Sequence, residues 1–284
     1  MPGYELLALE DQVADIIGKA QRGLKLTAED LAERADLPLN LVQALRQGIL
    51  EPETQEGALA RLAFVLNLHP PALLALAKAA WQPQPVSVMD GLAMFTTWYG
   101  DMTVNAYVVW DPNSREAASF DTGSSCQPMV AHLQANRLQL KRIFITHTHM
   151  DHLADLETLQ SAEEAKQAFC YGSAVENPLG LKPLVHGDGL ILGNLTIRVL
   201  GTSGHTPGGL SYFVEGLGKP LVIVGDALFA GSMGGAAYAY HEAIEHIQRR
   251  LLTLPHETVI CPGHGPLTTV GEERQHNPFF ASSK

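Results

Sequence analysis

One short segment constrains this chain more than any other, because residues 147–152 carry three histidines and one aspartate in the pattern HxHxDH. Residues 141–145, just before it, form a strand-like run. So many metal-ligand side chains this close together are hard to explain by packing. Since α/β folds place their chemistry on loops beyond the carboxyl ends of strands, the segment predicts an α/β protein with a metal site at such a strand end.

The spacing within this segment predicts two metal ions rather than one. His147 and His149 can turn toward one ion, whereas Asp151 and His152 open the following helix and can face a second. Each histidine alone is more simply explained as a core or surface residue. The combination disfavours that explanation.

Three further ligand residues occur later in the chain, each after an apolar, strand-like run: His205, Asp226 and His264. Residues 220–226 are apolar up to the aspartate that ends them, which predicts a buried strand. Glycine and proline flank the two histidines and allow the backbone to come close to a compact site. The sequence therefore predicts that distant segments complete the site.

The motifs HxHxDH, GHTPG, an apolar strand ending in GD, and PGHG occur in this order, and the chain thereby resembles the metallo-β-lactamase superfamily over roughly residues 90–275. The resemblance implies an α/β fold of the αββα type, with two sheets between helices. It also implies that Asp226 bridges two metal ions. The remaining implied ligands are His147, His149 and His205 for one ion, and Asp151, His152 and His264 for the other.

Imidazoles and carboxylates without a thiolate suit Zn, Fe or Mn, and we expect two divalent ions, with zinc favoured. Two such ions about 3.5–4 Å apart can share a water, lower its pKa toward roughly 7 and polarise the oxygen under attack. The expected nucleophile is a metal-bound hydroxide, with Asp151 as the catalytic residue that orients it or moves its proton. Asp121, in a DTG segment, is expected either to support a ligating histidine or to form a turn.

The family resemblance implies hydrolysis but leaves the substrate open, since related enzymes act on thioesters, lactones, phosphodiesters and β-lactams, and one is a sulfur dioxygenase. GDALFAGS at 225–232 and PGHGPLTT at 262–269 resemble glyoxalase II and its short bacterial relatives. They favour a thioester of the hydroxyacylglutathione type as the small-molecule substrate. The alternatives are a lactonase, a phosphodiesterase, or a ligand-sensing helix-turn-helix regulator with a metal-binding domain.

One departure from the thioesterase pattern concerns substrate binding. Those relatives usually continue from GS into a Gly-Arg-x-Asp segment, whereas residues 233–240 here contain no basic residue. A basic anchor for an acidic substrate is therefore missing at that place, and glutathione specificity is not predicted. Tyr238 and Tyr240 either line the pocket or simply pack against neighbouring residues.

The sequence of residues 1–80 predicts successive helices without a strand. Thr27 and Asp30 have the spacing of an N-terminal helix cap, and the pattern LAERADLPLNLVQALRQGILEP resembles the Cro/C1-type helix-turn-helix domain. By that analogy residues 39–47 would enter the major groove of DNA. However, residues 1–85 carry seven Lys and Arg against eleven Asp and Glu, and the predicted recognition helix has only Arg46 as a cation. Because DNA affinity needs clustered cations, DNA binding is disfavoured, and dimerisation or capping of the active site is the favoured use.

Composition agrees with two compact domains, since the chain has 284 residues of which 46% are hydrophobic. We expect a helical, helix-turn-helix-like domain at 1–80, a linker at 81–89 and a metallo-β-lactamase-fold catalytic domain at 90–284. Three scattered cysteines do not form a disulfide framework, and the net charge of −11 disfavours nucleic acid. With no leader-like start or membrane span in the sequence, we expect a cytoplasmic homo-oligomer without membrane contact.

Overall fold

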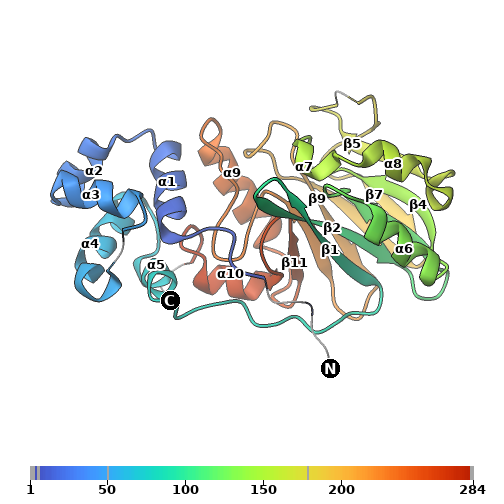
Figure 1. The fold of residues 1–284 in the computed structure, drawn as a ribbon, viewed down its shortest axis with the longest axis horizontal. Helices are drawn as coiled ribbons and strands as arrows, with labels where there is room; N and C mark the ends of the chain where they lie inside the picture. The colour runs from blue at the N-terminus through green and yellow to red at the C-terminus, as the bar shows by residue number, and fades with distance from the viewer. Residues whose placement is uncertain (1–3, 5–6, 50, 178, 282–284) are drawn as a thin grey trace.

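Two facing β-sheets form the larger part of the molecule, and helices α1 to α5 lie to one side of them (Figure 1). The structure, a computed structural model, describes residue 4 and residues 7–49, 51–177 and 179–281. Within those residues each sheet has six strands, and the sheet orders are β1-β2-β3-β4-β5-β6 and β12-β11-β10-β9-β8-β7. This architecture confirms the predicted α/β fold with two sheets between helices. The central pairs β3·β4 and β10·β11 are parallel, so their carboxyl ends lie at a common sheet edge.

The strands follow the chain order closely in both sheets. The first sheet contains β1 (Leu92–Tyr99), β2 (Met102–Trp110), β3 (Glu116–Phe120), β4 (Gln139–Phe144), β5 (Phe169–Ser173) and β6 (Lys182–Leu184). The second contains β7 (Gly189–Leu192), β8 (Leu195–Gly201), β9 (Leu210–Glu215), β10 (Leu221–Gly225), β11 (Val259–Pro262) and β12 (Thr268–Thr269). Strand β10 is buried along its whole length, as its uninterrupted apolar sequence predicts.

Aromatic side chains fill the space between the two sheets and fix the strand ends that lead into the site. Phe144 packs against Tyr212 with ring centroids 4.9 Å apart. The Tyr212 hydroxyl donates to the carbonyl of Ile145 at 2.8 Å, and the Tyr107 hydroxyl donates to the carbonyl of Pro262 at 2.7 Å. Each tyrosine therefore holds the backbone just before a predicted metal ligand.

Helices cover both outer faces of the sandwich. The first sheet is covered by α6 (Gln127–Ala135), α7 (Met150–Leu153), α8 (Leu156–Ser161) and the short η1 (Glu163–Ala165). The second is covered by α9 (Tyr240–His246), which continues as a π-helical turn η2 (Ile247–Leu251), and by α10 (Val270–His276).

Among the residues that the structure describes, five helices precede the first strand: α1 (Val13–Gly23), α2 (Ala28–Ala35), α3 (Leu39–Arg46), α4 (Pro52–Val65) and α5 (Pro70–Ala77). The predicted cap is present, because the Thr27 side chain accepts from the amide of Asp30 while the Asp30 carboxylate accepts from the amide of Thr27. These helices share one apolar core with the outer face of the second sheet and with α9. The helical region is therefore packed on the sandwich rather than tethered beside it.

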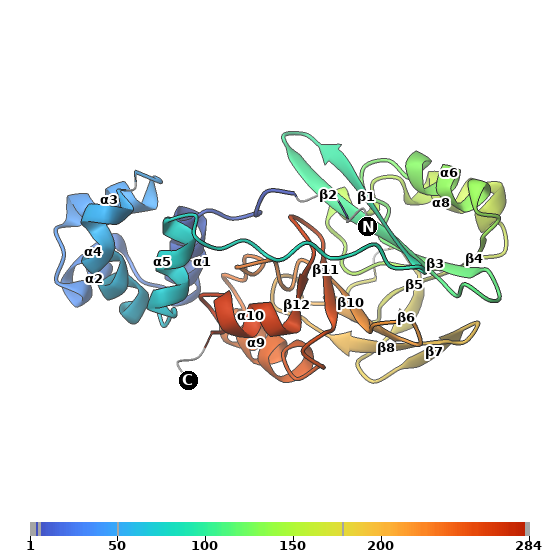
Figure 2. The same cartoon turned by 90° about the horizontal axis from the view of Figure 1, so that it is seen from below.

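The segment between α5 and β1 runs from the helical region across one face of the molecule to the first sheet (Figure 2). It is attached on the way, because the Trp81 ring stacks on His276 of α10 at 5.3 Å and the amide of Gln84 donates to Glu272 at 2.7 Å. The boundaries proposed above for the two domains stay predictions. None of the helices in the described residues has the length and apolarity needed to cross a bilayer.

Candidate metal centre

All seven side chains predicted from the sequence lie together at one edge of the sandwich. The loop after β4 carries His147 and His149, and α7 follows it immediately with Asp151 and His152. The β8–β9 loop brings His205, and the ends of the parallel strands β10 and β11 bring Asp226 and His264. The predicted loop-after-strand positions are thus confirmed by the fold.

The side chains form two groups of possible metal ligands. In the first, Nδ1 of His149 lies 3.1 Å from Nε2 of His147 and 3.1 Å from Nε2 of His205. Asp226 completes this group, with Oδ2 at 3.5 Å from Nε2 of His205 and 3.9 Å from Nε2 of His147. Four donor atoms from three separate loops therefore face one point.

The second group contains Asp151, His152 and His264. Oδ2 of Asp151 lies 3.4 Å from Nε2 of His152 and 3.3 Å from Nε2 of His264. Asp226 reaches this group as well, with Oδ1 at 3.2 Å from Nε2 of His152 and Oδ2 at 3.4 Å from Nε2 of His264. Its carboxylate therefore lies between the two groups.

The donor set fits divalent metal ions. Two nitrogens bound to one tetrahedral zinc at about 2.0–2.1 Å lie roughly 3.3 Å apart, close to the 3.1 Å separations in the first group. In the second, Nε2 of His152 and Oδ1 of Asp226 are buried and make no hydrogen bond among the described residues. Since a buried polar atom without a partner is costly, these orphaned atoms favour an ion at the site.

The other ring nitrogen of each well-buried histidine is held by a hydrogen-bond partner behind the cluster. Nδ1 of His152 lies 2.8 Å from the Asp121 carboxylate. The same carboxylate accepts from the amide and the hydroxyl of Thr146 at 2.7 and 2.8 Å. Asp121 therefore supports a ligand candidate, as one of its two sequence interpretations expected.

Backbone carbonyls do the same for two other histidines. Nδ1 of His205 donates to the carbonyl of Gly235 at 2.8 Å, and Nδ1 of His264 donates to the carbonyl of Thr103 at 2.6 Å. Each bond leaves Nε2 with a free lone pair directed at the cluster. These partners could not be predicted from the sequence, because any residue can supply a carbonyl.

The charges of the cluster depend strongly on one another. Burial lowers the pKa of His147 well below its ordinary value. Burial also opposes charge on His152, but Asp226 and Asp121 outweigh it and raise its pKa to about 10. For Asp226 the penalty of burial is outweighed by His152, so the pKa of its carboxyl is well below the usual range. Because a histidine must be deprotonated at the nitrogen that binds metal, the raised pKa of His152 means that metal binding there should release a proton.

The backbone comes very close to the cluster at Gly263. A Cβ added there would lie 2.2 Å from Oδ1 of Asp226 and 2.6 Å from Cε1 of His152. The amide of Gly263 donates to the carbonyl of Gly225 at 2.8 Å, which joins the ends of β10 and β11. The PGHG motif therefore needs glycine at this position to bring the two strand ends together.

A cavity of about 540 Å³ opens beside the first group. His149 and His205 line one side, and Tyr238, which is fully exposed, lines another. Tyr240, in contrast, is buried against the helical region, so only one of the two tyrosines lines the pocket. A larger cavity of about 670 Å³ lies under the linker and includes none of the seven cluster residues.

The cysteines take no part in the cluster within the described residues. Cys261, the one nearest in sequence to a ligand candidate, is fully buried in the core between the sheets. Burial raises the pKa of its thiol, so it is held as an inert, neutral side chain.

Comparisons with known proteins agree with this arrangement. Residues 99–264 match the family model described as the metallo-beta-lactamase superfamily. The probable metallo-hydrolase YqgX of Bacillus subtilis is 30% identical over 202 residues, which cover 64% of this chain and 94% of that protein. The hydroxyacylglutathione hydrolase GloC of Haemophilus influenzae is 28% identical over 200 residues, covering 63% of this chain and 93% of GloC.

Among solved structures, TTHA1623 in a di-iron-bound form is 30% identical with a TM-score of 0.53, and the match covers 66% of this chain and all of that one. The family match begins inside β1, so helices α1 to α5 lie outside it. It spans more than half of the chain and includes every member of the two ligand groups. This chain therefore belongs to the metallo-β-lactamase superfamily.

Proposed function

We propose that this protein is a dinuclear metal-dependent hydrolase that acts on a thioester of a small acyl compound. The convergence of seven ligand side chains into two groups joined by Asp226 carries this proposal. The choice of a thioester is supported by the likeness to GloC, which is named a hydroxyacylglutathione hydrolase, and by the GDALFAGS segment at 225–232.

The two ligand groups define which residues would hold each ion. One ion would be held by His147, His149 and His205, the other by Asp151, His152 and His264, with Asp226 shared. When bound, divalent ions there supply Lewis acidity and bring the pKa of water near neutrality. The chain itself keeps the ligands in place through Asp121 and the carbonyls behind the cluster.

Asp151 is the residue we propose for proton movement. Only 9% of it is exposed. Burial opposes its charge, but the hydrogen bond from His264 outweighs that effect and lowers the pKa of its carboxyl. An ionised carboxylate at this place can orient a water and accept its proton.

We propose zinc as the resident metal, with iron and manganese as alternatives. Imidazole and carboxylate donors suit all three ions. TTHA1623, which was solved in a di-iron-bound form, supports iron as the leading alternative. Elemental analysis of the purified protein distinguishes zinc, iron and manganese. It should find about two equivalents of metal.

A hydrolysis screen with Asp151→Ala tests the proposed function. We expect the wild type to cleave thioesters in preference to lactones and phosphodiesters, and the variant to lose about 10²-fold to 10⁴-fold in kcat. The matched control is Glu157→Ala, which removes an exposed carboxylate on α8 and should leave turnover unchanged. Activity on a phosphodiester alone, or full activity of the Asp151 variant, would show the proposal to be wrong.

The helix-turn-helix resemblance offers a second candidate, a regulator, but one contact disfavours it. The guanidinium of Arg46, the only cation of α3, turns inward and donates to the carbonyl of Ala14 at 3.0 Å. Burial and the neighbouring Arg22 lower its pKa. A recognition helix without an outward cation lacks phosphate contacts. Salt-sensitive binding to a specific duplex, without hydrolysis, would favour the regulator instead.

A further inference from the structure

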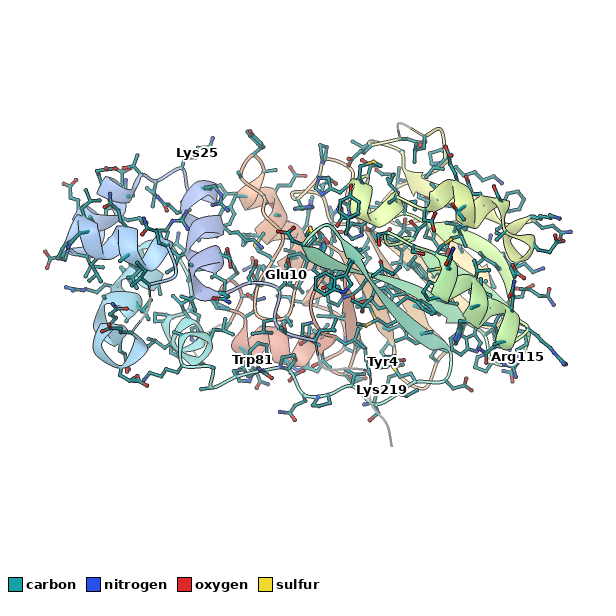
Figure 3. The ribbon with its side chains drawn as sticks, viewed as in Figure 1. Tyr4, Glu10, Lys25, Trp81, Arg115 and Lys219 are labelled. Carbon is teal, nitrogen blue, oxygen red and sulfur yellow. The ribbon has the colours of Figure 1, made fainter. Side chains whose placement is uncertain are left out.

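Helix α1 forms part of the wall of the cavity beside the metal-ligand cluster. Lys19 and Arg22 of α1 line the same cavity of about 540 Å³ as His149 and His205. In Figure 3 the helix runs between the labelled Glu10 and Lys25 and stands beside the segment that carries α9. The helical region thus contributes side chains to the place where a substrate must enter.

Polar contacts fix α1 against the loop that follows Asp226. The ammonium group of Lys19 donates to the carbonyl of Met233 at 2.9 Å and pairs with Asp11. The hydroxyl of Ser232 donates to the same Asp11 carboxylate. Lys19 also lies 5.0 Å from the ring centre of Phe229. Since Phe229 and Ser232 belong to the GDALFAGS segment, the helix is attached to the motif that marks the thioesterase relatives.

An apolar contact fixes the other end of the helix. Gly23 lies so close to the ring of Tyr240 that an added Cβ would come within 2.3 Å of it. Tyr240 is buried and begins α9. Helix α1 is therefore held at both ends, and the positions of its cavity-lining side chains are determined by the fold.

Arg22 is the cation of this cavity that remains free to bind a ligand. The charge of Lys19 is matched by Asp11, whereas the exposed Arg22 forms no ion pair within the described residues. The one acidic residue that lines the cavity, Glu242, accepts instead from the hydroxyl of Ser203 at 2.6 Å.

The loop after Met233, which also lines the cavity, carries no charge at residues 235–237. Residues 235–237 are Gly, Ala and Ala, and all three line the cavity. This is the stretch in which the sequence lacks the basic residue expected for an acidic substrate. Helix α1 supplies a cation to the lining of this same cavity.

We propose that Arg22 binds an anionic group of the substrate and that the thioester hydrolysed here therefore carries a carboxylate. This inference rests on the proposed function. A guanidinium presents paired N–H groups that match a carboxylate. Arg22 lines the same cavity of about 540 Å³ as His149 and His205, so one small molecule in that cavity can reach both the anchor and the cluster. Lys19 acts as a positioning residue, because its bonds to Met233 and Asp11 hold α1 in place.

A pair of thioesters that differ only in charge tests the proposal. The acetyl thioester of 3-mercaptopropionate carries a carboxylate, and that of 3-mercaptopropionamide is its neutral match. We expect Arg22→Ala to lower the ratio of kcat/KM for the anionic over the neutral substrate by about tenfold or more, through KM. Arg22→Lys should recover part of the ratio. A second pair, glutaryl and pentanoyl thioesters of 2-mercaptoethanol, places the charge on the acyl side instead.

The control is Arg34→Ala, which makes the same charge change at an exposed site on α2 outside the cavity. It should leave both substrates unaffected. If Arg34→Ala lowers the ratio as much as Arg22→Ala, the effect is one of net charge, and the proposed anchor is wrong. Equal turnover of charged and neutral substrates by the wild type in both pairs overturns it as well.

A binding measurement separates this inference from the proposed reaction. The probes are 3-(4-fluorobenzylthio)propionate and its amide, thioethers that cannot be hydrolysed, titrated into the metal-loaded full chain by ¹⁹F NMR. We expect Arg22→Ala to weaken binding of the carboxylate probe about tenfold relative to the amide. If Arg22→Ala weakens binding of the carboxylate probe but the wild type cleaves no thioester, Arg22 is the anion-binding residue and the thioesterase proposal is wrong. If thioesters are cleaved but the probes bind alike, the anchor fails alone.

Discussion

Asp121 has a strained backbone conformation that places its carboxylate against the residues of the site. Its φ of +56° lies in the left-handed region, which non-glycine residues rarely adopt. In this conformation one carboxylate reaches both Thr146 and the Nδ1 atom of His152. The DTG segment therefore supports a ligand candidate, whereas the structure assigns no turn to residues 121–123, so the first of its two sequence interpretations is the one that holds.

At the residue scale, we expect Asp121→Asn to lower metal affinity by about 10-fold to 100-fold. An amide group facing Nδ1 of His152 would favour the tautomer whose proton sits on Nε2, the atom that must bind metal. Competition with a chromophoric chelator measures the affinity.

The matched control is Asp111→Asn, a change at an equally buried aspartate that accepts from the amides of Asn113 and Asn194. It should reduce stability but leave metal affinity intact. Unchanged metal affinity in the Asp121 variant would contradict the role given to this carboxylate.

At the scale of elements, the close approach of α1 to α9 depends on Gly23. We expect Gly23→Ala to destabilise the protein by about 1–3 kcal/mol, since its methyl group would overlap the Tyr240 ring. Urea denaturation measures the change. Gly57→Ala is the control: no atom lies within 4 Å of an added Cβ there, and the same change in α4 should stabilise by about 0.5–1 kcal/mol. If both variants lose stability equally, helix packing at Gly23 is not as close as described.

Glu273 of α10 joins three segments and predicts a pH dependence of stability. Its buried carboxylate accepts from the amide of Gly231, the hydroxyl of Thr268 and the side-chain amide of Asn277. Burial outweighs these bonds and raises its pKa from 4.5 to about 7. Because the folded pKa is the higher one, this carboxyl favours folding most below about pH 4.5, and that contribution is lost as the pH rises through 7.

We therefore expect the free energy of unfolding of the wild type, relative to Glu273→Gln, to fall by about 2–3 kcal/mol between pH 5 and pH 8. Glutamine keeps the oxygen for Gly231 and Asn277 and can donate to Thr268. Urea unfolding at a series of pH values measures the difference. Parallel profiles for the two proteins would mean that Glu273 does not titrate in this range.

The elements that could be predicted from the sequence are those with local signals. The strands before His147 and Asp226 were predicted from their apolar runs, and the cap at Thr27 from its spacing to Asp30. The seven ligand candidates could be predicted because they lie in short motifs of histidine and aspartate that come after strand-like runs. Helix α1 was predicted only as one of several helices, because its contact with Tyr240 joins residues more than 200 positions apart. No local pattern encodes such a contact.

At the scale of the whole molecule, the helical region and the second sheet share a single apolar core. Leu31 and Leu59 of the helical region belong to the same cluster as Val222 of β10 and Phe279 near the end of the chain. Because this core is continuous from the helical region to the second sheet, we expect the two to unfold together.

We accordingly expect urea unfolding followed by circular dichroism at 222 nm and by tryptophan fluorescence to give one coincident transition. Trp81 makes fluorescence informative, because its stacking on His276 reports contact between the linker and α10. Trp81→Phe, which keeps an aromatic ring there, shows how much of the signal comes from this position. Two separated transitions would mean that the helical region is an independent folding unit.

The attachment of α1 beside the cluster also has a consequence for protein engineering. The residues that would hold metal all come after position 146, whereas the cation that we propose for substrate choice comes from a helix near the start of the chain. Reactivity and selectivity are thus encoded in separate stretches of sequence. Libraries restricted to the exposed positions of this one helix could retarget the enzyme to new esters without disturbing its catalytic ligands.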